Sequence, residues 1–126
     1  MTYQAKILRL DNNIKEEVDL QIKDVKITYF IATCPYSIKV GLYYPVQLSI
    51  WSLDRYNLIE IKNNTEQSIN RLGNTFAYSI TGKLCNGNLV SKGLVFEDKI
   101  LKKEFTYLEG KMISIKADRI NVEFEH

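Results

Sequence analysis

Apolar and polar side chains alternate along most of this chain, which is the pattern of a half-buried β-strand. The alternating apolar runs are Val25, Ile27, Tyr29 and Ile31; Val46, Leu48 and Ile50; Phe76, Tyr78, Ile80 and Leu84; Val90, Leu94 and Phe96; Phe105 and Tyr107; and Ile113, Ile115 and Ala117. Asn86-Gly87-Asn88 follows the third run and supplies residues that tolerate positive φ. The third and fourth runs are therefore predicted to form a hairpin.

The other segments give weaker patterns. Ala5 and Ile7 indicate a first strand that ends at the turn-forming residues 11–13. Residues 14–22 fit either one face of a helix or an alternating strand, and we favour the strand. A short helix is predicted at residues 65–72, because Asn64 or Thr65 can cap its start and Gly73 can end it.

Many short strands and at most one or two short helices predict an all-β fold, mainly antiparallel, in a single domain over residues 1–126. A parallel sheet would require long helical crossovers, which the pattern lacks. The expected architecture is a small barrel or sandwich. We favour a partly open Greek-key barrel, with an oligonucleotide-binding (OB) barrel as a fold-level analogy and an up-and-down barrel as the alternative.

Two segments have similar sequences: residues 49–57, near the middle, read SIWSLDRYN, and residues 114–121, near the end, read SIKADRIN. In both, the buried phase of the strand is predicted to slip by one residue near the Asp-Arg pair, from Ile50 to Ile59 and from Ala117 to Ile120. We interpret the segments as two strand bends in which Asp organises the turn and Arg points outward. A shared binding motif is the alternative.

Composition and charge indicate a folded globular protein but do not identify a binding partner. The 126 residues are 45% hydrophobic and 25% charged, as in folded globular proteins, and the net charge of +2 is spread without a basic or acidic tail. The first residues lack the apolar core of a signal peptide and no window approaches a membrane span, so we expect a cytoplasmic protein with no membrane partner. Cys34 and Cys85 are expected to be free.

The residue types needed for catalysis are scarce. The one histidine is His126, and the two distant cysteines give no zinc-ligand spacing. No glycine-rich phosphate loop or dinucleotide fingerprint occurs. Glu16-Glu17 and Glu97-Asp98 are interpreted as solvated surface charge. We therefore expect no enzyme activity, no catalytic residues, no cofactor and no metal.

The aromatic residues carry the most information about function. In the strand with buried Val46, Leu48 and Ile50, the opposite, polar face ends in Tyr43 and Trp51. Trp51 is either covered, by the short helix or a partner chain, or exposed as a binding anchor. With nearby aromatic and basic residues it defines the predicted binding set: Lys39, Tyr43, Trp51, Arg55, Tyr56 and Lys62.

The sequence favours two hypotheses for the function of the protein. The leading hypothesis is a small non-catalytic binding module that acts through this aromatic, mildly basic surface, with a protein partner or self-association into a homo-oligomer favoured. The alternative is single-stranded nucleic-acid binding on an OB-like barrel, where bases would stack on Tyr43, Trp51 and Tyr56.

Overall fold

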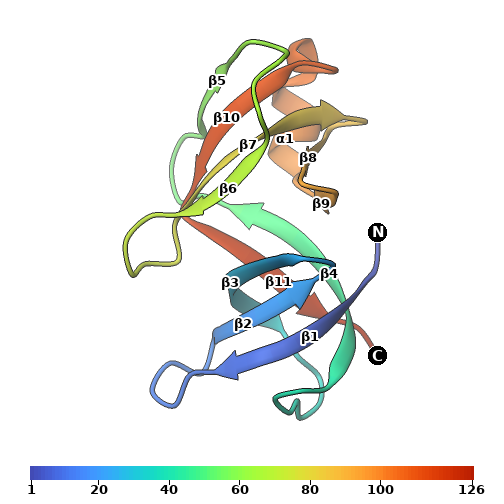
Figure 1. The fold of residues 1–126 in the computed structure, drawn as a ribbon. Coiled ribbons are helices and arrows are strands. Elements are labelled where there is room, and N and C mark those ends of the chain that lie inside the picture. Colours follow the sequence, from blue (N-terminus) through green and yellow to red (C-terminus); the bar gives the residue numbers. More distant parts are fainter.

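The computed structural model describes residues 1–126 and shows two lobes built almost entirely of strands (Figure 1). The chain forms eleven strands, one α-helix and one 3-10 helix, and all strand pairs except one are antiparallel. The predicted all-β, mainly antiparallel fold with few short helices is confirmed.

The lower lobe in Figure 1, called the barrel lobe here, is a closed barrel with the strand order β1-β2-β3-β11-β4. Its strands are β1 (Tyr3–Leu10), β2 (Glu17–Ile22), β3 (Val25–Thr33), β4 (Tyr43–Trp51) and β11 (Arg119–Phe124). β4 pairs back with β1, and β11 runs parallel to β3. The strand interpretation of residues 14–22 is confirmed over β2, whose Val18, Leu20 and Ile22 are buried.

The upper lobe, called the sheet lobe, is a sheet with the order β5-β10-β7-β8-β9. Its strands are β5 (Asn57–Glu60), β6 (Ser68–Arg71), β7 (Tyr78–Cys85), β8 (Asn88–Ser91), β9 (Leu94–Phe96) and β10 (Met112–Ala117). β6 pairs with the first half of β7 and β8 with the second half. The predicted hairpin is confirmed: Asn86 and Gly87 link β7 to β8 with φ of 54° and 76°.

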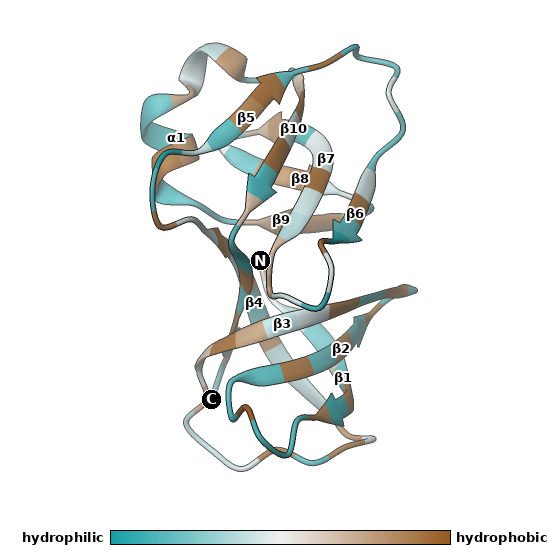
Figure 2. Ribbon diagram, turned by 90° about the vertical axis from the view of Figure 1, so that its left-hand side faces the viewer, coloured by the Kyte–Doolittle hydropathy of each residue, from teal (hydrophilic) through white to brown (hydrophobic).

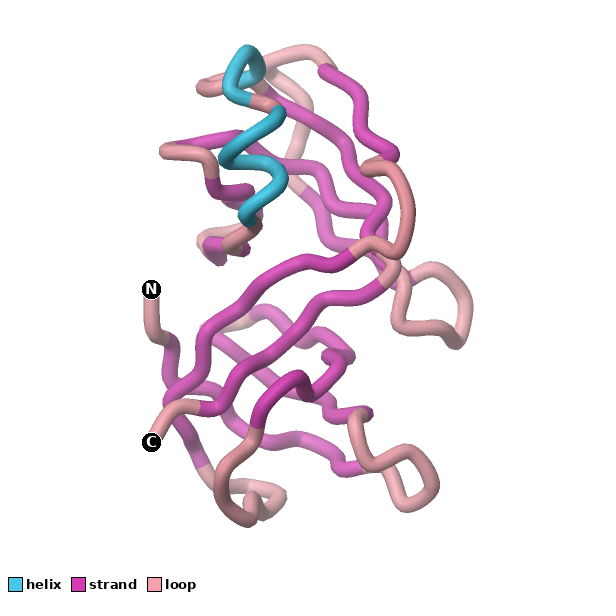
Figure 3. The backbone as a smooth tube through the Cα atoms, turned by 180° about the vertical axis from the view of Figure 1, so that it is seen from behind, coloured by secondary structure: helices cyan, strands magenta, loops and turns pink.

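The predicted helix at residues 65–72 is wrong. That segment contains β6, because its backbone pairs with β7, and this pairing outweighs the weak helical spacing of Ile69 and Leu72. The α-helix is instead α1 (Lys99–Glu104), followed by the 3-10 helix at Thr106–Leu108 (Figure 3). Asp98 caps α1 by accepting a hydrogen bond from the Leu101 N–H at 2.9 Å, and Leu101 is the residue that α1 buries.

The two Asp-Arg segments lie where the chain passes between the lobes. β10 and β11 form one path that bends at Asp118, and burial shifts from Ile113, Ile115 and Ala117 to Ile120, Val122 and Phe124, as predicted. The predicted slip in the first segment is wrong. After β4, residues 52–56 form a loop, Leu58 is half-buried and Ile59 is 61% exposed, so the even-numbered phase continues.

One hydrophobic cluster includes side chains from both lobes. It contains 25 buried residues, among them Ile7 and Leu20 of the barrel lobe and Ile80 and Ile113 of the sheet lobe. Figure 2 shows apolar residues alternating with polar ones along the strands of both lobes. The core is therefore continuous across the boundary between them.

Candidate functional site

A groove of about 490 Å³ lies between the two lobes. Its floor consists of residues 47–51 of β4 with Asn121 and Glu123 of β11. Its opposite wall is residues 97–100, which run from the end of β9 into the start of α1. Ser52 and Tyr56 close one end. Figure 3 shows β4, β11 and the helix on the same side of the molecule.

The start of β1 determines where the groove begins. β1 pairs with β4 only as far as Val46, so the next residues of β4 have a free edge. The Glu97 N–H donates to the Leu48 carbonyl there at 3.0 Å, next to an isolated bridge between Ser49 and Glu97. Because the Leu48 and Ile50 side chains are buried, these residues line the groove through their backbone.

Trp51 is held by an arginine from the second Asp-Arg segment. The guanidinium carbon of Arg119 lies 4.2 Å from the centroid of the Trp51 ring and 3.9 Å from that of Phe30. Phe30 also packs edge-on against Phe76, with the ring centroids 5.4 Å apart. The expectation that both arginines point outward is therefore wrong for Arg119, because cross-strand pairing of Arg119 with Trp51 lays its cation between two rings.

The sequence left open whether Trp51 is covered or exposed, and the structure gives an intermediate answer. Arg119 lies against its ring, and the residue remains 36% exposed at the groove. The Nε of Arg119 is buried and has no hydrogen-bond partner. Trp51 thus presents a fixed aromatic surface whose position depends on Arg119.

Tyr56 closes the groove through a fixed hydrogen bond. Its hydroxyl donates to Asp98 Oδ1 at 2.6 Å, and its ring stacks on Phe105 with the centroids 6.4 Å apart. Burial, and then the hydrogen bond to Asp98, raises the pKa of the Tyr56 phenol, so it stays a neutral donor. Both carboxylate oxygens of Asp98 have donors, since the other oxygen caps α1.

The groove carries unbalanced negative charge. Three carboxylates line it, those of Glu97, Asp98 and Glu123, against the one basic residue Lys99. Glu97 and Glu123 form no ion pair, because the three ion pairs of the chain all involve Arg9. No group of three or more His, Cys, Asp or Glu side chains is arranged to hold a metal ion.

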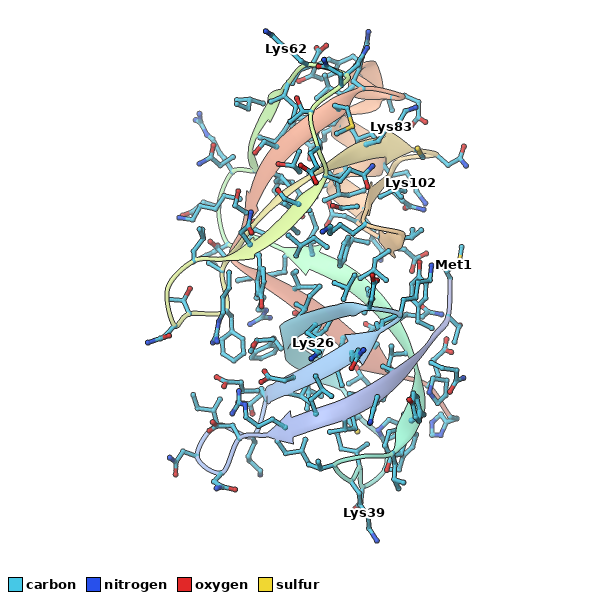
Figure 4. All side chains as sticks on the ribbon, viewed as in Figure 1. Met1, Lys26, Lys39, Lys62, Lys83 and Lys102 are labelled. Carbon is cyan, nitrogen blue, oxygen red and sulfur yellow. The ribbon has the colours of Figure 1, made fainter.

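The structure brings together half of the predicted binding residues. Trp51 and Tyr56 line the groove, and Arg55 lines a neighbouring hollow that also includes Tyr56. Figure 4 places Lys39 at the bottom of the barrel lobe and Lys62 at the top of the sheet lobe. Tyr43, 63% exposed at the start of β4, is also outside the groove.

Sequence reasoning did not place four residues in the groove, namely Glu97, Asp98, Asn121 and Glu123. It also missed the contacts of Arg119 with Phe30 and Trp51. One local signal was present, because Asp98 is a good capping residue directly before the helix-forming residues 99–104. Arg119 had no local signal, since its contact with Trp51 depends on pairing between strands that are distant in sequence.

Comparison with known proteins gives a family. A family model matches residues 1–125, and the chain belongs to this family, which is described as "Uncharacterised conserved protein UCP019853". Neither the curated proteins nor the solved structures include a significant match. Among the helices, none has the length and apolar character needed to cross a membrane.

Proposed function

We propose that this family member is a small non-catalytic binding module, and that the groove between its lobes receives a protein partner or a second copy of the chain. The observation that carries the proposal is the meeting of Trp51 and Tyr56, from β4 and the following loop, on one groove of about 490 Å³. Grooves of this size with a few aromatic and polar groups are typical binding sites, and aromatic residues dominate binding energy at interfaces.

Exposed apolar side chains extend this surface. Leu53 is 72% exposed in the loop after Trp51, and Ile100 is 39% exposed on the groove wall. Apolar groups gathered beside a hollow are a common mark of interaction surfaces.

We also propose a cytoplasmic location, because Cys34 and Cys85 are both free thiols, as a reducing compartment would keep them.

The test fills the groove without altering the core. Ser49→Arg places a large side chain on the groove floor, where Ser49 is only partly buried, and Ser37→Arg makes the same change in an exposed loop of the barrel lobe. We expect a self-associated species in light scattering, or a partner quantified by mass spectrometry after capture, to be lost with Ser49→Arg and retained with Ser37→Arg. Identical association of both variants and the unmodified protein would contradict the proposal.

Nucleic-acid binding remains the second candidate. Support for an OB-like barrel comes from the five-strand order, in which β4 lies beside β1 as in a Greek key and the sheet lobe replaces the loop between the last two barrel strands. The charges oppose it. The outer face of β2, which OB barrels use with β3, carries Glu17 and Asp19, and the groove carries Glu97 and Glu123.

The chain has one tryptophan, so tryptophan fluorescence, excited where tyrosine does not absorb, reports on Trp51 alone. Titration with single-stranded oligonucleotides at low salt should leave that emission unchanged if a protein is the partner. Saturable quenching that weakens steeply as salt rises would instead favour nucleic acid.

A further inference from the structure

We propose that the groove selects a cation, and that its occupant is an extended basic segment of a partner protein. A lysine or arginine side chain of the segment would lie against the carboxylates of Glu97 and Glu123, and an adjacent apolar residue would contact Trp51 and Ile100. This inference rests on the proposed function and specifies the chemistry of the partner.

The first argument is that these carboxylates serve no pairing role within the chain. On the barrel lobe, Asp11, Glu17 and Asp19 are all paired with Arg9. In the groove, Glu97 and Glu123 accept no hydrogen bond from any side chain and form no ion pair. The protein as a whole has a net charge of +2, so the acidic character is a local property of the groove.

The second argument concerns which charges are free to meet a ligand. Both oxygens of Asp98 are occupied by Tyr56 and by the backbone of α1, so Asp98 fixes the wall. Glu97 and Glu123 are the carboxylates left to meet a ligand. An anionic ligand would meet like charges, whereas an ammonium or guanidinium group would satisfy them.

The third argument favours a protein segment over a free small cation. The charged part of the groove is continuous with apolar side chains, since Trp51 and Ile100 line it and Leu53 lies next to it in the chain. A segment that alternates basic and apolar residues would match both parts. The groove floor follows the β4 backbone for residues 47–51, which is the length of a short extended peptide.

A second copy of the chain fits less well. Two lysines, Lys26 and Lys92, line a separate hollow together with Asp24, and this hollow shares no lining residue with the groove. Figure 4 shows Lys26 on a face of the barrel lobe. Docking that face into the groove would join copies head to tail, which leads to open chains or rings.

The experiment uses the full chain and three blocked peptides that lack tryptophan: acetyl-GRLRLG-amide, its glutamate twin GELELG and its glutamine twin GQLQLG. Binding is followed by Trp51 fluorescence and by calorimetry at 50 mM and 500 mM NaCl. We expect saturable binding of the arginine peptide, weaker binding at high salt, and no saturable binding of the glutamate peptide.

The variant with Glu97→Gln and Glu123→Gln tests the carboxylates, and the variant with Glu16→Gln and Glu66→Gln is the matched control, because both of these residues are exposed and outside the groove. Two partly exposed ion pairs correspond to about a tenfold change in affinity. We expect the groove variant to bind the arginine peptide about tenfold more weakly and the control to bind it as the unmodified protein does.

Three outcomes would overturn the inference: equal binding of the glutamate peptide, equal binding by the groove variant, or no saturable signal from the arginine peptide at millimolar concentration. These outcomes are separable from failure of the proposed function. If Ser49→Arg abolishes association but the arginine peptide does not bind, the groove is an interface without cation selectivity. A self-associated species lost with the glutamine variant would identify a second copy as the occupant and reject a separate partner.

Discussion

Arg119→Ala should destabilise the protein, because it removes the cation that lies between Phe30 and Trp51. Each cation–π contact contributes about 0.5–1 kcal/mol when exposed and about 2 kcal/mol when desolvated. The two contacts, at 3.9 and 4.2 Å, therefore total about 1–3 kcal/mol. The buried Nε has no partner, and its removal returns about 1 kcal/mol of desolvation cost. The difference is about 0–2 kcal/mol, and because Arg119 is partly desolvated we expect a loss in the upper half of that range, about 1–2 kcal/mol.

Urea unfolding at pH 7, followed by far-UV circular dichroism and by the emission of Trp51, measures this loss. In a separate thermal scan, the melting temperature should fall by roughly 4–8 °C for a chain of this size. The Trp51 emission should also shift to the red, because its ring gains water contact. Arg119→Lys should recover less than half of the loss, since an ammonium group cannot stack as a planar guanidinium does.

Arg55→Ala is the control, because Arg55 belongs to the other Asp-Arg pair, is exposed, and its side chain makes no hydrogen bond, ion pair or ring contact. Its free energy of unfolding should stay within about 0.5 kcal/mol of the unmodified protein. If Arg119→Ala were equally silent, the stack would not stabilise the fold, and the position of Trp51 would have to come from the strand backbone alone.

Three further changes test other parts of the fold. Asp118→Ala should cost about 0.5–2 kcal/mol in urea unfolding, because its carboxylate accepts the Leu53 N–H at 2.8 Å, and Asp118→Asn should cost less. Gly82→Ala should cost more than about 2 kcal/mol or prevent folding, seen by circular dichroism, since a Cβ there would lie 2.3 Å from a backbone oxygen of β8. Burial tends to raise the pKa of Asp19, but the hydrogen bond from Arg9 outweighs burial and lowers this pKa. The ionised Asp19 therefore stabilises the fold above about pH 4, and this stabilisation is lost as the pH falls through the folded pKa of Asp19. The stability difference between the unmodified protein and Arg9→Met should therefore be largest at pH 7 and shrink towards pH 2; a difference that grows in acid would contradict the assignment.

Strand alternation predicted the fold class because most strands bury one face. The β7–β8 hairpin was predictable to the residue, since Asn86 and Gly87 adopt the positive φ that their types tolerate. Residues 65–72 were misassigned and the helix at residues 99–104 was not predicted, because each segment is too short for periodicity to separate helix from strand. Strand pairing decided the first case, and the Asp98 cap with one buried leucine decided the second.

The candidate site was only partly predictable for a different reason. Trp51 stood out because it lies out of phase with the buried residues of its own strand, and that is a local signal. Lys39 and Lys62 lie at opposite ends of the molecule because the chain leaves the barrel lobe after β4. The alternation of apolar and polar residues carries no information about that change of lobe. The role of Arg119 likewise requires the register between β4 and β11.

The position of the last two strands has a consequence for synthesis on the ribosome. β10 lies between β5 and β7, and β11 lies between β3 and β4, so residues 112–124 occupy the middle of both lobes. Any product that stops before residue 112 separates β5 from the rest of the sheet lobe and leaves the barrel open between β3 and β4, with unpaired edges that attract proteases and aggregate. Limited proteolysis of a chain ended at residue 111 should find no protected fragment of the barrel lobe. We therefore expect β1, β2 and β3 to complete their barrel only after β11 has been translated.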